Sequence, residues 1–247
     1  MNRYVALGSS MAAGPGIRPR APGAPLRSGR SARNYPHLVA AELNLELVDR
    51  TFSGATTAHA LTERQRSAPP QIDTLDGSES LVTITIGGND VGYVPMLMAA
   101  ALPRPLASLI RRGLPGDQDR ALAQVGESLR NVGNAVRERA PHARVLFVDY
   151  LTLLPPAGVS AAPLPDVEAD LCRHVAAGLE EQTAAAAAAT GCGIVRAGQA
   201  SRDHHPWSAQ PWAVGPGWPL PWRPAPFHPN AAGMRAVADL VAAQYRP

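Results

Sequence analysis

Two adjacent serines, Ser9 and Ser10, stand where a short apolar segment gives way to a glycine-rich turn. The sequence from residue 4 to residue 16 reads YVALGSSMAAGPG. A strand that ends in a turn of small residues presents side chains at the carboxyl edge of a sheet, where open α/β folds hold their ligand sites. One of the two serines is therefore a candidate nucleophile, and the alternative is an ordinary solvated turn.

Three further positions suit the same edge of a sheet. Gly54 follows the second predicted strand, Asn89 follows the third, and His228 precedes the last predicted helix. Each has an ordinary explanation, because Gly54 and Asn89 suit turns and His228 suits a helix start with Asn230 as its N-cap. All of them would have to coincide by chance with the serine turn, so the set together favours a catalytic site.

The apolar pattern alternates between strands and helices along the chain. Residues 81–86, LVTITI, form a β-branched run typical of a buried parallel strand. The complete series predicts strands at 4–7, 45–49, 81–86, 144–149 and 193–196, and helices at 31–43, 58–65, 117–139, 166–189 and 231–244. This alternation predicts one α/β/α domain over residues 1–247, with a parallel sheet covered on both faces. Residues 95–116 are ambiguous and are interpreted as short helices over the site.

Four sequence blocks resemble the SGNH, or GDSL-type, hydrolase family of serine esterases and lipases. They are YVALGSSMAAG from residue 4, SGATT from residue 53, IGGND from residue 86 and HPNAAG from residue 228. The blocks occur in the family's order and span nearly the whole chain. The resemblance implies a three-layer, flavodoxin-like α/β/α sandwich with a mostly parallel five-stranded sheet, and hydrolysis of carboxylic esters.

The resemblance also assigns roles to residues. It places the nucleophile on Ser10 and the general base on His228, with an oxyanion hole made by the backbone N–H groups of Ser10 and Gly54 and the side-chain amide of Asn89. An imidazole activates a serine hydroxyl by taking its proton, and fixed N–H donors stabilise the oxyanion of the tetrahedral intermediate. An acyltransferase with the same two residues is an alternative, and so is a degenerate binding module without activity.

The sequence departs from the family pattern at two positions. Ser9 stands where an aspartate usually precedes the nucleophile, and Ala225 stands where an aspartate usually precedes the histidine by three residues. The histidine still needs an acceptor at Nδ1. We predict the backbone carbonyl of Ala225, held between prolines, as this acceptor. The competing candidate is the carboxylate of Asp203.

Residues 203–227 are rich in tryptophan and proline and show neither a helical nor a strand period. Tryptophans in such a segment close over a core or line an active-site loop. We predict Trp207, Trp212 and Phe227 as walls of a substrate pocket. Lipid, short-chain ester and acetylated glycan substrates all remain open, since these side chains suit an acyl chain or a sugar ring.

Composition limits the partners. The formal net charge of +3 and the 17% of charged residues are not the pattern of a nucleic-acid-binding protein. No apolar run approaches the ~20 residues that a membrane span needs. The start of the chain, as written, has no signal peptide, so a cytoplasmic protein is expected and a secreted mature form stays open. The oligomeric state is not readable.

Cofactors and cysteines are judged by spacing. We predict no cofactor and no metal, and interpret the adjacent His204 and His205 as surface residues. Cys172 lies in the predicted helix 166–189 and Cys192 lies just past its end. The two are on the order of 25 Å apart, too far to form a disulfide. A last segment, residues 18–33, carries several arginines and is either a solvated loop or a rim that attracts an anionic substrate. These arginines are Arg18, Arg20, Arg27 and Arg30, with Arg33 at the segment's end.

Overall fold

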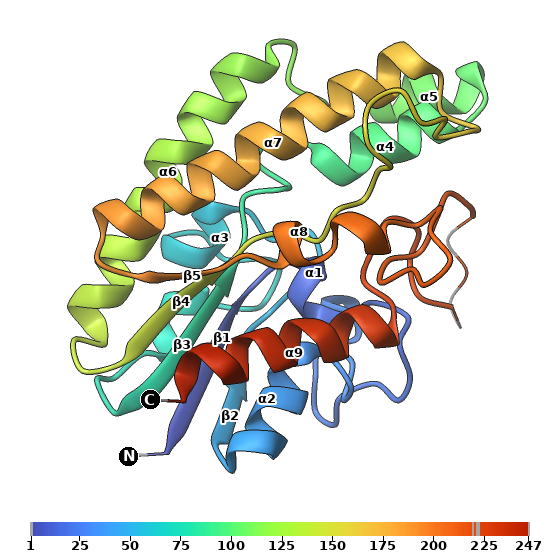
Figure 1. Cartoon of the computed structure of the whole chain (residues 1–247). Coiled ribbons are helices and arrows are strands. Elements are labelled where there is room, and N and C mark those ends of the chain that lie inside the picture. The colour runs from blue at the N-terminus through green and yellow to red at the C-terminus, as the bar shows by residue number, and fades with distance from the viewer. Residues whose placement is uncertain (1, 219, 221–222, 247) are drawn as a thin grey trace.

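A five-stranded parallel sheet forms the centre of the protein (Figure 1). The computed structural model describes residues 2–218, 220 and 223–246, so residues 219, 221 and 222 of the predicted 203–227 loop lie outside the described residues. The strands are β1 (Arg3–Gly8), β2 (Glu46–Asp49), β3 (Glu79–Thr85), β4 (Arg144–Val148) and β5 (Gly193–Val195). Their order in the sheet is β2-β1-β3-β4-β5, and every neighbouring pair is parallel. The predicted fold class is confirmed, and the sheet is entirely parallel.

Burial along the strands follows their place in the sheet. All residues of β1 after Arg3 are buried, and β3 and β4 are nearly as well covered, whereas the edge strands β2 and β5 are partly exposed. Strands covered on both faces carry continuous apolar runs, which explains the β-branched sequence of β3.

Helices cover both faces of the sheet. One layer contains α2 (Tyr35–Leu43) and α9 (Ala231–Tyr245), which pack against each other, and the other contains α3 (Thr57–Leu61), α6 (Gln118–Arg139) and α7 (Asp166–Ala189) (Figure 1). The connections hold α4 (Tyr93–Ala101), α5 (Arg104–Arg111) and the short α1 (Ser10–Ala13) and α8 (Ala197–Ala200). Three 3₁₀ turns complete the series: η1 (Leu26–Ser28), η2 (Gln71–Thr74) and η3 (Arg202–His204).

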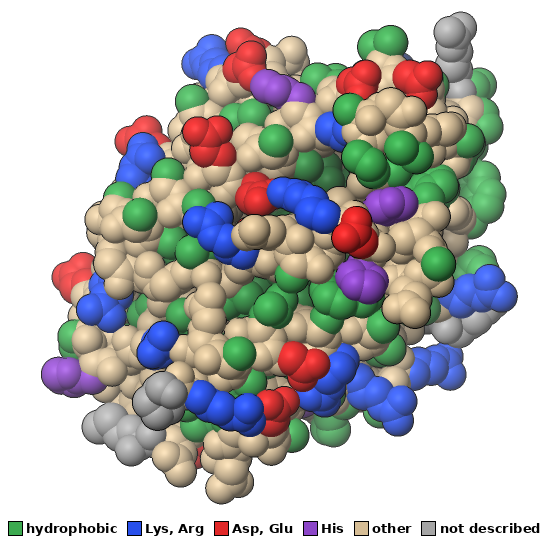
Figure 2. Space-filling view, viewed as in Figure 1, with side chains coloured by type: hydrophobic (Ala, Val, Ile, Leu, Met, Phe, Trp, Pro, Cys, Tyr) green, Lys and Arg blue, Asp and Glu red, His purple; other side chains and the backbone are tan. Residues whose placement is uncertain are grey.

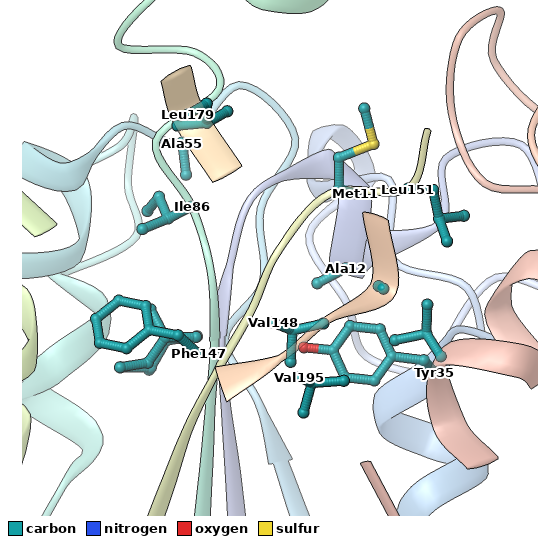
Figure 3. Packing of buried hydrophobic residues seen from close by; sticks show 14 of the residues in the cluster. Met11, Ala12, Tyr35, Ala55, Ile86, Phe147, Val148, Leu151, Leu179 and Val195 are labelled. Atoms are coloured by element: carbon teal, nitrogen blue, oxygen red, sulfur yellow. The ribbon is translucent and has the colours of Figure 1, made fainter. Parts of the chain in front are cut away.

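The core fills the space between the sheet and each helix layer. Consecutive residues of β4 show the arrangement, because Phe147 lies on one side of the strands with Ile86 while Val148 lies on the other with Tyr35 (Figure 3). Alternation of this kind is what a strand buried on both faces requires.

Side-chain caps fix the starts of three helices. Asn34 accepts the backbone N–H of His37 at the start of α2, Asp117 accepts that of Arg120 before α6, and Asn230 accepts that of Gly233 before α9. These caps satisfy N–H groups that the first helical turn leaves free. The predicted aspartate start of α6 is confirmed. The Asn34 cap explains why α2 begins at Tyr35 and not near residue 31.

The surface carries charges of both signs. Figure 2 shows basic and acidic side chains next to each other on the face that it displays. No helix among the described residues is long and apolar enough to cross a membrane. Both cysteines are free, and Cys172 is buried.

Candidate active site

The serine turn lies at the carboxyl end of β1, beside β3. Gly8 pairs with Thr85 at the end of the β1–β3 ladder, and the Ser9 N–H donates to the Thr85 carbonyl at 2.9 Å. Chain order reverses here, because β1 lies between β2 on one side and β3 on the other. This is the switch point at which open parallel sheets bind ligands.

Gly8 allows the turn to pass this close to β3. Its φ is +156°, and a Cβ at this position would lie 2.6 Å from the Thr85 carbonyl oxygen. The side chain of Gln71 then holds Gly8 from the other side, because Oε1 accepts the Gly8 N–H at 2.7 Å and Nε2 donates to the Gly8 carbonyl at 3.0 Å. Sequence analysis missed Gln71, since nothing in its sequence neighbourhood distinguishes it.

The fold brings Ser10 and His228 together from opposite ends of the chain. The distance from Ser10 Oγ to His228 Nε2 is 2.8 Å, and His228 Nδ1 lies 2.8 Å from the Pro226 carbonyl oxygen. A carbonyl only accepts hydrogen bonds, so Nδ1 carries the hydrogen. Nε2 is then the acceptor for the Ser10 hydroxyl, as a general base must be.

The prediction that the Ala225 carbonyl orients His228 is wrong in residue, because the acceptor is Pro226. The Ala225 carbonyl is used by the His228 backbone N–H, at 3.2 Å, in a tight turn. Phe227 lies within this turn with a φ of +56°, in the left-handed region that a bulky side chain seldom adopts. That conformation brings the Pro226 carbonyl to the ring of the histidine that follows.

The alternative acceptor, Asp203, does not reach His228. Asp203 belongs to η3, is exposed and lines a separate cavity of about 350 Å³ together with Tyr150 and Arg202. Among the described residues no hydrogen bond joins it to the histidine, whose Nδ1 is already occupied. In this geometry the group that accepts from the His228 ring is a neutral carbonyl and not a carboxylate.

Burial sets the charge state of His228. The side chain is 8% exposed, and this desolvation lowers the pKa of its imidazole, while the Pro226 carbonyl acts in the opposite direction. A neutral imidazole at neutral pH is the form that accepts a proton.

The three predicted oxyanion donors follow β1, β2 and β3, which are neighbours in the parallel sheet. Within the described part of the chain, no hydrogen bond uses the backbone N–H of Ser10 or of Gly54. The Asn89 amide uses one N–H on the Ala55 carbonyl, at 2.8 Å, which leaves its second N–H available. Gly54 has a φ of +80°, while a Cβ there would meet only Gln65 Nε2, at 3.6 Å. The backbone conformation, and not lack of space within the protein, is the reason for this glycine.

Asp90 joins the second and third blocks. Its carboxylate accepts the Thr57 N–H at 3.1 Å and the Thr57 hydroxyl at 2.5 Å. Burial raises the pKa of Asp90 against the lowering effect of these hydrogen bonds. The aspartate of the IGGND block therefore joins the turns that follow β2 and β3, and among the hydrogen bonds of the described residues none links it to Ser10 or His228.

Tyr150 braces the site where the family aspartate is missing. Its hydroxyl lies 3.0 Å from Ser9 Oγ and accepts the backbone N–H of Gly88 at 3.1 Å. Ser9 and Gly88 directly precede the predicted nucleophile and Asn89. A Cβ on Gly88 would lie 2.3 Å from the Tyr150 ring, so this contact depends on the glycine. Sequence analysis did not find Tyr150, although it follows β4 at the same edge of the sheet.

The predicted pocket residues do not form one wall. Phe227 is buried and lines a cavity of about 270 Å³ together with Met98, Leu102 and Trp218. Trp212 instead stacks on His204, with ring centroids 4.0 Å apart, and Trp207 donates through Nε1 to the Ala162 carbonyl. These two tryptophans pack against the core, and neither is among the residues that line the cavity at Phe227.

His204 and His205 show no metal site. Among the described residues, no group of three or more His, Cys, Asp and Glu side chains has an arrangement that can hold a metal ion. His204 Nδ1 donates to the Gln210 carbonyl at 2.8 Å, and the ring stacks on Trp212. Its contacts are those of a loop residue.

Comparison with known proteins identifies the chain. The sequence pattern of the GDSL-like lipase/acylhydrolase family matches residues 6–236. "Lipase 2" of Streptomyces coelicolor is 34% identical over 251 residues, which cover 96% of this chain and 83% of that protein. Among solved structures, an extracellular lipase from Streptomyces rimosus superposes with a TM-score of 0.80 at 25% identity, covering 99% of each chain. Phospholipase A1 from Streptomyces albidoflavus gives 0.79 at 26% identity, covering 100% of this chain and 99% of its own.

The fold and these relatives define a carboxylic ester hydrolase. The chain belongs to the GDSL-like lipase/acylhydrolase family, and the resemblance predicted from its four blocks is confirmed.

Proposed function

We propose that this chain, as one domain over residues 1–247, cleaves lipid esters through an acyl-enzyme on Ser10. The observation that carries the proposal is the chain of two 2.8 Å contacts from Ser10 Oγ through the His228 ring to the Pro226 carbonyl. It gives a serine hydroxyl a neutral base in the correct tautomer.

In the first step, Ser10 Oγ attacks the ester carbonyl carbon and its proton passes to His228 Nε2. The negative charge on the carbonyl oxygen is stabilised by the N–H groups of Ser10 and Gly54 and by the free N–H of Asn89. The intermediate then expels the alcohol, which takes the proton from Nε2. Water attacks the acyl-enzyme by the same route, returning the proton to Ser10 and releasing the acid.

Two features support an acyl chain as the part of the substrate that is recognised. The cavity beside Phe227 has a largely apolar lining that includes Met98, Leu102 and Trp218, and it adjoins the residue before His228. The relatives are described as lipases and a phospholipase A1. One of them is described as extracellular, which favours the secreted form over a cytoplasmic one for this chain.

The test is covalent labelling with a fluorescent organophosphonate, combined with turnover of p-nitrophenyl esters of increasing chain length. Wild-type protein should be labelled at Ser10 and should prefer longer acyl chains, while Ser10→Ala should lose both labelling and turnover. Exposed Ser108→Ala is the matched control and should retain both. Full ester turnover in Ser10→Ala would refute the nucleophile assignment. Fastest turnover of the acetyl ester would refute the lipid substrate.

A further inference from the structure

A cavity of about 280 Å³ lies next to the candidate site, between the arginine-rich segment and residues 50–71. Its lining contains Arg30, Arg50 and His59, and none of the described lining residues is acidic. The remaining lining residues are Gly23, Pro25, Phe52, Gln65, Ser67, Ala68, Pro69 and Gln71. Basic side chains without a facing carboxylate attract anions.

Two of the residues that line this cavity each carry a buried polar atom with no partner among the described residues. In the described part of the chain, five buried side-chain polar atoms make no hydrogen bond, and two of them, Arg30 Nε and Gln65 Oε1, belong to residues of this lining. The first is a donor and the second an acceptor. Leaving such atoms unpaired is unfavourable, so a ligand that satisfies both is favoured.

The orientation of the Gln65 amide is fixed by a separate contact. Its Nε2 donates to the Ser53 carbonyl at 3.0 Å. The carbonyl oxygen of the amide is therefore the atom left to accept a hydrogen bond from a ligand.

Arg30 contacts Asp49 and also lines this cavity. Burial lowers the pKa of its guanidinium, and Asp49 and Arg50 act in opposite directions on it. Arg30 Nη1 donates to the backbone carbonyl of Asp49. The Asp49 carboxylate accepts from the Asn34 amide at 2.9 Å and from the Thr51 hydroxyl at 2.6 Å, and Asp49 is not among the described lining residues of this cavity. Arg30 and Arg50 line the same cavity, so an anion bound there is attracted by both guanidinium groups.

We propose that this cavity binds a phosphate group, with Arg30 and Arg50 donating to its anionic oxygens and Gln65 Oε1 accepting from a hydroxyl of the ligand. The hydroxyl is either the P–OH of free phosphate or a glycerol hydroxyl next to a phosphodiester. Arginine suits this role because its N–H groups match phosphate oxygens.

The position of the cavity connects it to the candidate site. Gln65 holds the carbonyl that precedes Gly54, and Gln71, another lining residue, holds both backbone polar groups of Gly8. A phosphate bound here therefore lies in a cavity lined by the two glutamines that hold the serine turn and the glycine turn. The binding itself does not depend on the proposed catalytic role of Ser10.

The test is isothermal titration calorimetry on the full chain with inorganic phosphate, sulfate and glycerophosphocholine as separate probes. We expect saturable phosphate binding with a Kd of about 1 mM or tighter. Exposed Arg50→Gln should weaken it about tenfold or more, as expected for a lost charge-assisted hydrogen bond. Arg27→Gln, an exposed arginine of the same segment outside the lining, is the matched control and should change the Kd less than twofold.

The probes separate the parts of the proposal. Sulfate has no hydroxyl at neutral pH, so it should bind more weakly than phosphate if Gln65 accepts a hydrogen bond. Glycerophosphocholine binding as tightly as phosphate identifies a lipid headgroup as the source, and phosphate binding alone identifies the free ion. Absence of saturable binding of every probe overturns the proposal, and so does an equal effect of Arg50→Gln and Arg27→Gln. The Ser10→Ala variant should bind phosphate normally, which separates this test from that of the esterase mechanism.

Discussion

Asp149 offers a sharp test of the electrostatics at the sheet edge. It follows β4 and is 4% exposed. Its Oδ1 accepts the Gly198 N–H at 2.8 Å, whereas Oδ2 has no partner among the described residues. Burial raises the pKa of this carboxyl from 3.8 to about 7, and the negative charge of Glu180 adds to the effect.

The sign of the effect on stability follows from proton binding. Between pH 4 and pH 7 the folded protein keeps this carboxyl protonated while the unfolded chain has lost the proton. The contribution of this carboxyl to the free energy of unfolding is therefore largest at low pH. It falls as the pH rises from 4 to 7 and does not change further above pH 7. At about 1.4 kcal/mol per pH unit, the loss from pH 5 to pH 8 is about 2–3 kcal/mol.

Asp149→Asn removes the charge and keeps an oxygen for the Gly198 N–H. We therefore compare the free energy of unfolding of the variant minus that of wild type at two pH values. This difference should be about 2–3 kcal/mol larger at pH 8 than at pH 5. Urea denaturation of both proteins at the two pH values measures this difference. The exposed Asp239→Asn is the control and should show no such change. If the difference in free energy of unfolding between Asp149→Asn and wild type is the same at both pH values, the carboxyl is ionised throughout and its pKa is not raised.

Two further predictions concern the candidate site. Because burial lowers the pKa of His228, kcat/KM should fall at low pH with a midpoint below 6.5, the ordinary value for histidine. Asp203→Asn should leave both this midpoint and kcat/KM unchanged. A large loss of kcat/KM in that variant would make Asp203 a member of the site. Tyr150→Phe removes the hydroxyl that joins Ser9 and Gly88, so kcat should fall about tenfold with little change in KM. Tyr93→Phe is the matched control. Tyr93 is a buried tyrosine that lines the same cavity as Tyr150, and within the described residues its own hydroxyl makes no hydrogen bond. An equal loss of kcat in both variants would contradict the positioning role of Tyr150.

The regular parts of the fold were predictable because their signals are local. The β-branched run of β3 and the long apolar periods of α6 and α7 led to the correct elements, and α7 matches its predicted range. The predicted ends of the helices were less accurate, because contacts outside the apolar pattern decide where a helix begins and ends. The helix predicted from residue 58 to residue 65 ends at Leu61, because residues beyond it turn back through a bridge between Gln65 and Ala68. Pairing of this kind is not visible in apolar spacing.

In the candidate site, too, some residues were predictable from the sequence and others were not. Ser10, Gly54, Asn89 and His228 stand in blocks that the sequence displays, and the fold places them at one sheet edge. The residues that hold them were not predictable, because Gln71 and Tyr150 act through contacts with partners 63 and 141 residues away along the chain. Their types are common, and only the completed sheet brings them under the serine turn.

The acceptor of His228 shows why even a correct chemical idea selected the wrong residue. We predicted a backbone carbonyl as the acceptor, and we chose Ala225 because it occupies the position of the missing aspartate. An aspartate side chain reaches Nδ1 from three residues away, but a backbone carbonyl is confined to the path of the chain. In the observed turn the Ala225 carbonyl is taken by the His228 N–H, and the left-handed conformation of Phe227 leaves Pro226 as the carbonyl that faces the ring. Replacing a side-chain acceptor by a backbone acceptor therefore shifts the contact along the chain, and the conformation of a single residue decides by how much.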